Sequence, residues 1–523
     1  MLLIICSKVS KHDSRNNKKN NYFWILEHIH MIIDESKKLI ESMSMNEKRY
    51  FKIFINKNIF GSQNKYLLLF DIINSNTTIT EDTLKKHVKE QDYSDKNISY
   101  DINYLNKIIL RSLNEFHHEK TISLKLQNHI KSVEILFYKG LYDECLKIIR
   151  KAKKLSLKNE NEILILELLN WEKKCMGYSK GFYGAMSVNE KIDNYFNYIK
   201  ENREITDLYY HSYFLKNNVG KIPFEGILEE FNKIIGNAIF KRDGSSLHSV
   251  QSKIFYFLTI ANYFHVINKK EKELLNLEKT IDVFDNNPFY KEENPLDYIS
   301  VYTRIIDIYK KSDDTTFHNK IEALRGFENI LDFQKSVAQE RIFFHTNQAE
   351  LEFLIFNNNF EEGLKMMQIV AKSLKENKFN IEPYYFIGMY YQFACILLIN
   401  KNLSQSLKYI NLILNEFKLE DRPKTFIKTE IINLIIHYEL KNYKLALHNH
   451  STFNKKYKRV FKLNFIEKNI IQAIIQISEN PFSTNETVEF KKLHTKIQKK
   501  NDLEDNISNK IYRKYIDSKL NRN

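Results

Sequence analysis

Four short stretches of the chain repeat one local pattern. They begin at Lys139, Asn357, Asn400 and Leu440, and they read KGLYDECL, NNNFEEGL, NKNLSQSL and LKNYKLAL. Each is a polar turn followed by a large apolar residue, two mostly polar positions, a small residue and a leucine. On a helix the apolar residue and the leucine share a face, and the small residue lets a neighbouring helix come close. The recurrence therefore predicts helix pairs that stack into a solenoid.

The composition favours long helices. The 523 residues include only 12 Gly and 6 Pro, so few residues interrupt the periodic segments. Alternating Val, Ile and Thr runs bounded by tight turns, which a sheet would require, are rare. We therefore expect more than half of the residues in helices and essentially no sheet.

The chain divides into four segments. We expect a disordered tail and a lead-in helix in residues 1–40, and a compact helical unit in residues 41–120. Residues 121–480 are expected to form the solenoid, and residues 481–523 to form basic C-terminal capping helices. The large apolar residues of the last three motifs lie 43 and 40 residues apart, which exceeds the 34 of a standard tetratricopeptide repeat. The repeat boundaries between about 177 and 294 stay open.

Residues 41–120 allow two interpretations. Ser44 and Glu47 form a capping-box pattern that opens a helix. A short helix from Thr80, a turn around Ser94 and a longer helix to about Phe116 follow the outline of a helix-turn-helix. The segment 97–107, which would read DNA, has one acid and one lysine at its expected exposed positions, and phosphate contacts would need more cations. We expect a helical cap on the first repeat and keep a DNA-binding unit as the alternative.

The positive charge of the chain is weak evidence for a nucleic-acid partner. The 80 Lys and Arg residues exceed the 65 Asp and Glu residues by 15. Only 13 of the cations are Arg, and Lys lacks the planar fork that makes bidentate contacts with bases and phosphates. A nucleic-acid partner is therefore possible but is not the expectation.

Cysteine spacing and hydropathy argue against a disulfide-rich, zinc-binding or membrane-spanning protein. Cys6, Cys145, Cys175 and Cys395 are widely separated, so they indicate neither a disulfide framework nor a zinc site. The longest apolar stretches, such as 386–399, are shorter than a membrane-spanning helix. We expect no membrane span, no metal, no cofactor and a cytoplasmic location.

Enzymatic motifs are missing from the sequence. The Gly220-Lys221 pair has Leu215 where a phosphate-binding loop would need its first glycine. Neither GxSxG nor HExxH occurs. His448 and His450 are two residues apart, and on a helix they would diverge by about 200°; the pair His28 and His30 has the same spacing. The sequence therefore predicts a non-enzymatic protein.

Two parts of the sequence resemble known proteins. Residues 140–146 resemble the turn and second helix of a tetratricopeptide repeat, and the motifs at Phe360, Leu403 and Tyr443 look like the same element. Residues 45–51, followed by a leucine-rich helix and the first motif, are similar to the opening of a group of uncharacterised helical bacterial repeat proteins. The resemblance implies an all-α, right-handed α-solenoid of antiparallel helix pairs with an N-terminal helical cap.

The resemblance also implies a binding surface. In such solenoids the first helix of each pair faces a concave groove that binds proteins or peptides, and aromatic and amide side chains can hold an extended peptide there. The first helices before the second and third motifs supply the candidate peptide-binding residues Asn347, Glu350, Phe353, Tyr384, Tyr385, Tyr391 and Gln392. Packing of these aromatics between repeats is the alternative.

The expected function is that of a protein- or peptide-binding scaffold. A DNA-linked regulator is the second hypothesis, with residues 41–120 as the DNA-binding unit and the solenoid as a sensor.

Overall fold

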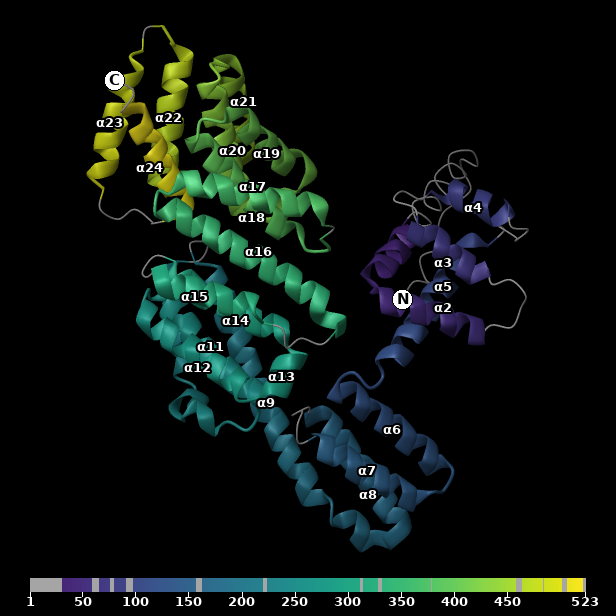
Figure 1. Ribbon diagram of the computed structural model, residues 1–523. Helices are drawn as coiled ribbons and strands as arrows, with labels where there is room; N and C mark the ends of the chain where they lie inside the picture. The colour runs from purple at the N-terminus through teal and green to yellow at the C-terminus, as the bar shows by residue number, and fades with distance from the viewer. Residues whose placement is uncertain are drawn as a thin grey trace, which may run out of the picture. The chain divides into compact units, whose positions relative to one another are not determined.

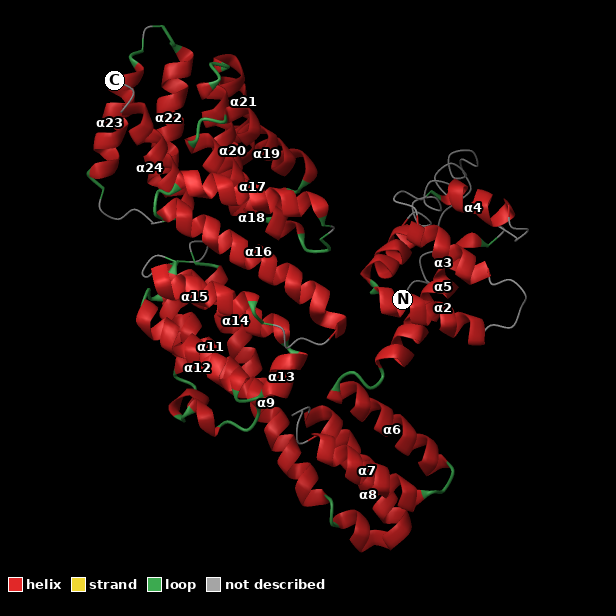
Figure 2. Ribbon diagram, in the orientation of Figure 1, coloured by secondary structure: helices red, strands yellow, loops and turns green. Residues whose placement is uncertain are grey.

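The structure is a computed structural model of the whole chain. It describes residues 31–58, 65–75, 80–90, 97–156, 162–219, 223–310, 314–327, 332–377, 379–457, 463–482, 484–500 and 506–520. α-Helices hold most of these residues, and none of them forms a strand (Figure 2). The all-α prediction is confirmed for this part of the chain. The tail expected in residues 1–30 lies outside it.

The chain separates into two compact units, residues 1–199 and 200–523 (Figure 1). The boundary lies inside one helix, α9. The first unit contains a helix over 31–42 and the elements α2 (Met45–Asn58), α3 (Lys65–Ser75), α4 (Glu81–Glu90), α5 (Ile98–His117), α6 (Ile122–Tyr138), α7 (Tyr142–Ser156), α8 (Glu162–Met186) and the start of α9 (Asn189–Asn217).

The helices up to α5 surround one apolar core. Phe51, Phe70, Leu84 and Ile102, one from each of α2 to α5, are fully buried in it. The predicted capping box opens α2: the backbone N–H of Ser44 donates to the Glu47 carboxylate at 2.6 Å, and the Glu47 N–H donates to Ser44 Oγ at 3.3 Å. These bonds satisfy backbone donors that a helix start leaves free.

The second unit continues α9 and adds α10 (Phe224–Ile235), η1 (Ala238–Lys241), η2 (Gly244–Ser246), α11 (Val250–Val266), α12 (Lys270–Asp285), α13 (Pro288–Glu293), α14 (Pro295–Tyr309), α15 (Asp314–Arg325), α16 (Asp332–Phe356), α17 (Phe360–Glu376), α18 (Pro383–Ile399), α19 (Leu403–Glu416), η3 (Leu419–Asp421), α20 (Pro423–Glu439), α21 (Tyr443–Tyr457), α22 (Phe465–Glu479), α23 (Glu486–Gln498) and α24 (Ile507–Leu520). From α14 onward, each even-numbered helix up to α22 contacts the following helix and the next even-numbered helix. The even-numbered helices are the first members of successive pairs, and α14, α16, α18, α20 and α22 form a row.

One backbone turn joins the two helices at each of the four motifs. Gly140, Asn358, Lys401 and Lys441 have φ values of 75°, 57°, 60° and 59°. In each case the next residue donates its N–H to the carbonyl five residues earlier at 2.9 to 3.0 Å. This is the Schellman ending of a helix, which needs a residue in the left-handed region. Asn268, with φ 56°, makes the same turn between α11 and α12. This is a fifth turn of the same kind, at a position where the sequence motif is absent.

The small residue of each motif is where two helices touch. Cys145, Gly363, Ser406 and Ala446 are all buried. Ser406 Oγ donates to the carbonyl of Ala394 at 2.7 Å, and Cys145 Sγ makes the equivalent contact, 3.4 Å, with a carbonyl that also lies 12 residues earlier. The predicted close approach is therefore confirmed. A larger side chain would separate the second helix from the first.

The C-terminal segment adds one more helix pair and a last helix that contacts several first helices. α23 pairs with α22, as the second helix of a further pair. The last helix, α24, contacts α22 and α23 and also reaches α16 and α18. The expected capping helices of residues 481–523 therefore correspond to α23 and α24, and α24 lies across the row of first helices.

Enlarging the small residue should destabilise the second unit. We expect Gly363→Leu and Ala446→Leu each to lower the free energy of unfolding by about 1 to 3 kcal/mol, because the helix contact would be overfilled. Urea or thermal denaturation measures the change. Gly363→Ala and Lys444→Leu are the controls: a Cβ at 363 would lie 3.5 Å from the Ile396 side chain, an ordinary contact, and Lys444 is exposed. Unchanged stability of both leucine variants would contradict this packing register.

Candidate functional site

Polar side chains connect the first helices of neighbouring pairs in the second unit. Gln392 of α18 donates from Nε2 to Glu352 Oε1 of α16 at 3.0 Å. Glu352 also accepts from the Lys310 ammonium at the end of α14. Burial acts to lower the pKa of Lys310, but the carboxylates of Glu352 and Asp307 outweigh it and raise that pKa. Lys310 therefore stays charged inside a half-buried polar stripe.

A cavity of about 260 Å³ opens beside this stripe. Its lining includes Lys310, Glu352, Tyr391, Gln392 and Arg422. Three cations, Lys310, Arg422 and Lys428, and one carboxylate, that of Glu352, thus line one space. Such a space suits a group that accepts hydrogen bonds, such as a peptide carboxylate or carbonyl.

Gly388 makes room for the arginine of this cavity. A Cβ at position 388 would lie 1.8 Å from Nη1 of Arg422, so any other residue would displace the guanidinium. Arg422 donates from Nη1 to the carbonyl of Tyr384 at 3.2 Å, and its guanidinium carbon lies 4.0 Å from the centre of the Tyr384 ring. Stacking on an aromatic ring restrains the planar guanidinium and leaves its edge for further hydrogen bonds.

Two of the seven candidate peptide-binding residues line this cavity, and a third contacts its Arg422. Tyr391 and Gln392 line it but are themselves buried. Tyr384 is 46% exposed beside Arg422. Of the three, only Tyr384 offers a large exposed surface.

The other four candidates pack within or between helices. Tyr385 is buried, and Asn347 donates its amide to a backbone carbonyl one turn earlier at 2.7 Å. Glu350 forms an ion pair with Arg325 of α15. Phe353 stacks on Phe317 of α15, with ring centres 4.6 Å apart. These positions share the packing role that the sequence left open as the alternative.

No sequence pattern indicates Arg422, Gly388 and Lys310 as members of the site. Arg422 stands in a polar connection, directly before a proline. It meets Gly388 across 34 residues, and no short motif connects positions so far apart. Pro423 at the first turn of α20 is the one local signal, since it fixes where that helix begins.

A second buried polar cluster lies at the turn of Asn268. Glu273 occupies the position that a small residue takes in the four motifs, and it is only 5% exposed. His265 Nδ1 lies 3.1 Å from its carboxylate, and Arg304 donates to it at 3.0 Å. Burial acts to raise the pKa of Glu273, but His265 and Arg304 outweigh it and lower that pKa. The cluster joins α11, α12 and α14 with charges that are already paired.

The described residues contain no further chemical centre. No group of three or more histidine, cysteine or acidic side chains in the described ranges could hold a metal ion. Burial raises the pKa of Cys175 and of Cys395 to about 12, so neither thiol is a ready nucleophile. Cys6, the His28 and His30 pair and the Gly220-Lys221 pair lie outside the described residues.

In the first unit, the structure corrects one expectation about α5. Asp101, the acid expected on the exposed face of the 97–107 segment, is 7% exposed and forms an ion pair with Lys65. The exposed residues of α5 include Asn103, Lys107 and Arg111, one turn apart. The expectation was wrong because the lysine partner on α3 allows the carboxylate to be buried.

Comparisons with known proteins supply no relative. No protein-family model, no curated protein and no solved structure matches the chain. Among the described helices, none is long and apolar enough to cross a membrane. Any functional conclusion therefore rests on the geometry of this chain.

His345, a partly buried histidine of α16 that lies 3.4 Å from the Tyr385 hydroxyl, should make stability depend on pH. Burial, reinforced by Arg341 and Arg422 and opposed by Asp307, lowers the pKa of His345 from 6.5 to about 4. Between these values the unfolded chain binds a proton that the folded chain does not, so stability falls as the pH drops from about 6.5 to 4, by up to about 3 kcal/mol.

Urea unfolding at pH 7 and pH 4.5 tests this expectation. His345→Gln should lose less stability over that range than the unsubstituted chain, because the glutamine cannot take up the proton. His118→Gln, at an exposed histidine, is the control. Equal losses in the unsubstituted chain and in His345→Gln would show that His345 does not govern the acid dependence.

Proposed function

We propose that the chain is a non-enzymatic scaffold that binds a protein or peptide along the first helices of the second unit. In this proposal the helix pairs form a right-handed, tetratricopeptide-like solenoid with antiparallel helices, capped by the N-terminal unit. The recurring turn and the row of first helices support this architecture. Three described cysteines are free, which favours the reducing cytoplasm as the location.

The arrangement of Arg422 carries the proposal. Its guanidinium lies on a glycine surface, stacks on a half-exposed tyrosine and faces a cavity lined by two further cations, Lys310 and Lys428. Arg and Tyr are the residue types that most often dominate the energy of protein interfaces. An acidic side chain or a carbonyl of a bound peptide would find charged donors there, and Tyr384 would cover its apolar part.

Substitution of Tyr384 or Arg422 should weaken the binding of the partner. We expect Tyr384→Ala and Arg422→Ala each to reduce recovery of specific partners from native lysate at least about tenfold, since such anchors contribute 2 kcal/mol or more. Affinity capture with the full chain, followed by mass spectrometry, measures the recovery. Lys408→Ala, at an exposed position of α19, should leave it unchanged. Equal recovery with all three variants would contradict binding at this face.

The exposed residues of α5 favour a DNA-linked regulator as the second candidate. Lys107 and Arg111 lie one turn apart, with Asn103 one turn before them, and the acid next to them is withdrawn into an ion pair. These few cations could contact only a small number of phosphates. The candidate therefore ranks below the protein-binding scaffold.

DNA binding should be weak and independent of sequence. We expect association with duplex DNA to fade steeply between about 50 and 200 mM salt, because it depends on counterion release around lysines. Gel shifts with the full chain and with a chain beginning at Lys120 measure it. Salt-resistant, sequence-selective binding that is lost without residues 1–119 would instead promote the regulator to the first candidate.

A further inference from the structure

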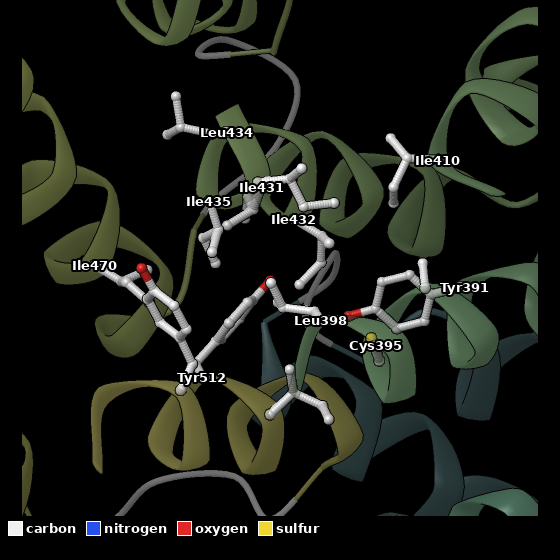
Figure 3. Packing of buried hydrophobic residues seen from close by; sticks show 14 of the residues in the cluster. Tyr391, Cys395, Leu398, Ile410, Ile431, Ile432, Leu434, Ile435, Ile470 and Tyr512 are labelled. Atoms are coloured by element: carbon white, nitrogen blue, oxygen red, sulfur yellow. The ribbon is translucent and has the colours of Figure 1, made fainter. Parts of the chain in front are cut away.

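The last helix covers part of the face on which the proposed function depends. α24 contacts α16, α18 and α22 of the row, and it packs on α23. Its residue Ser508 meets Tyr391 of α18, with 2.8 Å between the two hydroxyl oxygens, and both residues are buried. Figure 3 shows Tyr512 of α24 in one apolar cluster with Tyr391, Leu398 of α18 and Ile470 of α22.

Six of the seven buried residues of α24 form one stripe. Ser508, Ile511, Tyr512, Tyr515, Ile516 and Lys519 are all buried in the structure. Their spacing is that of an amphipathic helix whose anchors at i, i+3, i+4, i+7, i+8 and i+11 enter a groove. The opposite side carries Arg513, which is exposed.

Lys519 is the most unusual of these anchors, because it is a lysine with only 6% of its surface exposed. Its ammonium pairs with Glu439 of α20 and lies 2.7 Å from Glu486 Oε1 of α23. Lysine is almost never buried without such partners. Burying a charge pair costs desolvation free energy, and apolar residues of similar volume would often hold the helix in place equally well.

Aromatic rings complete the surroundings of Lys519. Its Nζ lies 5.0 Å from the centre of the Tyr438 ring and 5.7 Å from the centres of the Phe490 and Tyr515 rings. Rings around an ammonium attract it through their negative faces. Tyr438 and Phe490 belong to α20 and α23, so two walls and both carboxylates of this lysine pocket remain when α24 is removed.

We propose that the surface under α24 is a binding site for an amphipathic helix of a partner protein, and that α24 is its resident occupant. The partner helix would carry two aromatic residues and, one turn after the second, a lysine that enters the pocket of Glu439, Glu486, Tyr438 and Phe490. It competes with α24 for this site. The inference rests on the proposed function, because it names the kind of partner that the face of first helices binds.

A labelled peptide with the sequence of residues 506–520 tests the proposal against the full chain. In the unsubstituted chain, α24 competes at about millimolar effective concentration, so the peptide should bind weakly. Lys519→Glu places a carboxylate against Glu439 and Glu486 and should release α24. Fluorescence polarisation should then show the peptide binding at least about tenfold more tightly, as removal of a tethered competitor requires.

The control makes the same charge reversal on the exposed side of the helix. Arg513→Glu should leave the weak binding of the peptide unchanged, and a peptide that itself carries Lys519→Glu should not bind either variant. Equal peptide affinity for the unsubstituted chain and for a folded Lys519→Glu chain would overturn the proposal. A concentration-dependent dimer of the unsubstituted chain, dissociated by the peptide, would also overturn it, because a second copy would then be the occupant.

Hydrogen exchange of the unsubstituted chain gives a test that does not depend on the variant folding. Amides of α24 should exchange at least about tenfold faster than those of α18 and α20, because a displaceable helix opens without global unfolding. Exchange of α24 as slow as that of α18 would make it a permanent part of the core. That result would end this inference but leave the proposed binding at Tyr384 and Arg422 intact, since the capture experiment tests that site separately.

Discussion

The contact between the two helices of a pair determines the rest of this structure. A residue in the left-handed region ends the first helix, and a small residue five positions later lets the second helix lie against the first. At Ser406 the approach is close enough for a side chain to bond a backbone carbonyl of the preceding helix. Because each pair is fixed in this way, its first helix presents a defined face to the next pair, and the polar stripe of Lys310, Glu352 and Gln392 can form.

The sequence was sufficient for the local unit because both of its determinants are local. The position of the turn and the small residue can be read within eight residues, and the structure bears out both at all four motifs. The turn at Asn268 was missed because Glu273 stands where the motif expects a small residue. The buried glutamate is held by His265 and by an ion pair with Arg304 of α14, which lies 31 residues later. A local sequence pattern cannot predict a contact with a residue so far along the chain.

The candidate site was harder to predict for the same reason. Helical periodicity shows that Phe353 and Tyr391 each lie on a defined side of a helix, but not what that side meets. Phe353 meets Phe317 of the preceding pair, whereas Tyr391 meets Ser508 of a helix more than a hundred residues later. Whether one side of a helix lines a groove or packs against another helix depends on the rotation from one helix pair to the next. That rotation results from many side-chain contacts together and not from any single motif.

The cavity and the last helix share residues, and this links the two parts of the proposed face. Ile507 and Ser508 line the cavity together with Arg422 and Lys310, and Ser508 also holds α24 on Tyr391. A small ligand that bridged Arg422 and the start of α24 would stabilise the docked helix. A longer partner that displaced α24 would take those two residues away from the cavity. By linkage, each of the two binding events must then change the affinity for the other by the same factor. If α24 is displaced as proposed, a small ligand that uses Ser508 in the cavity would oppose that release, whereas a partner helix long enough to displace α24 could still contact Arg422.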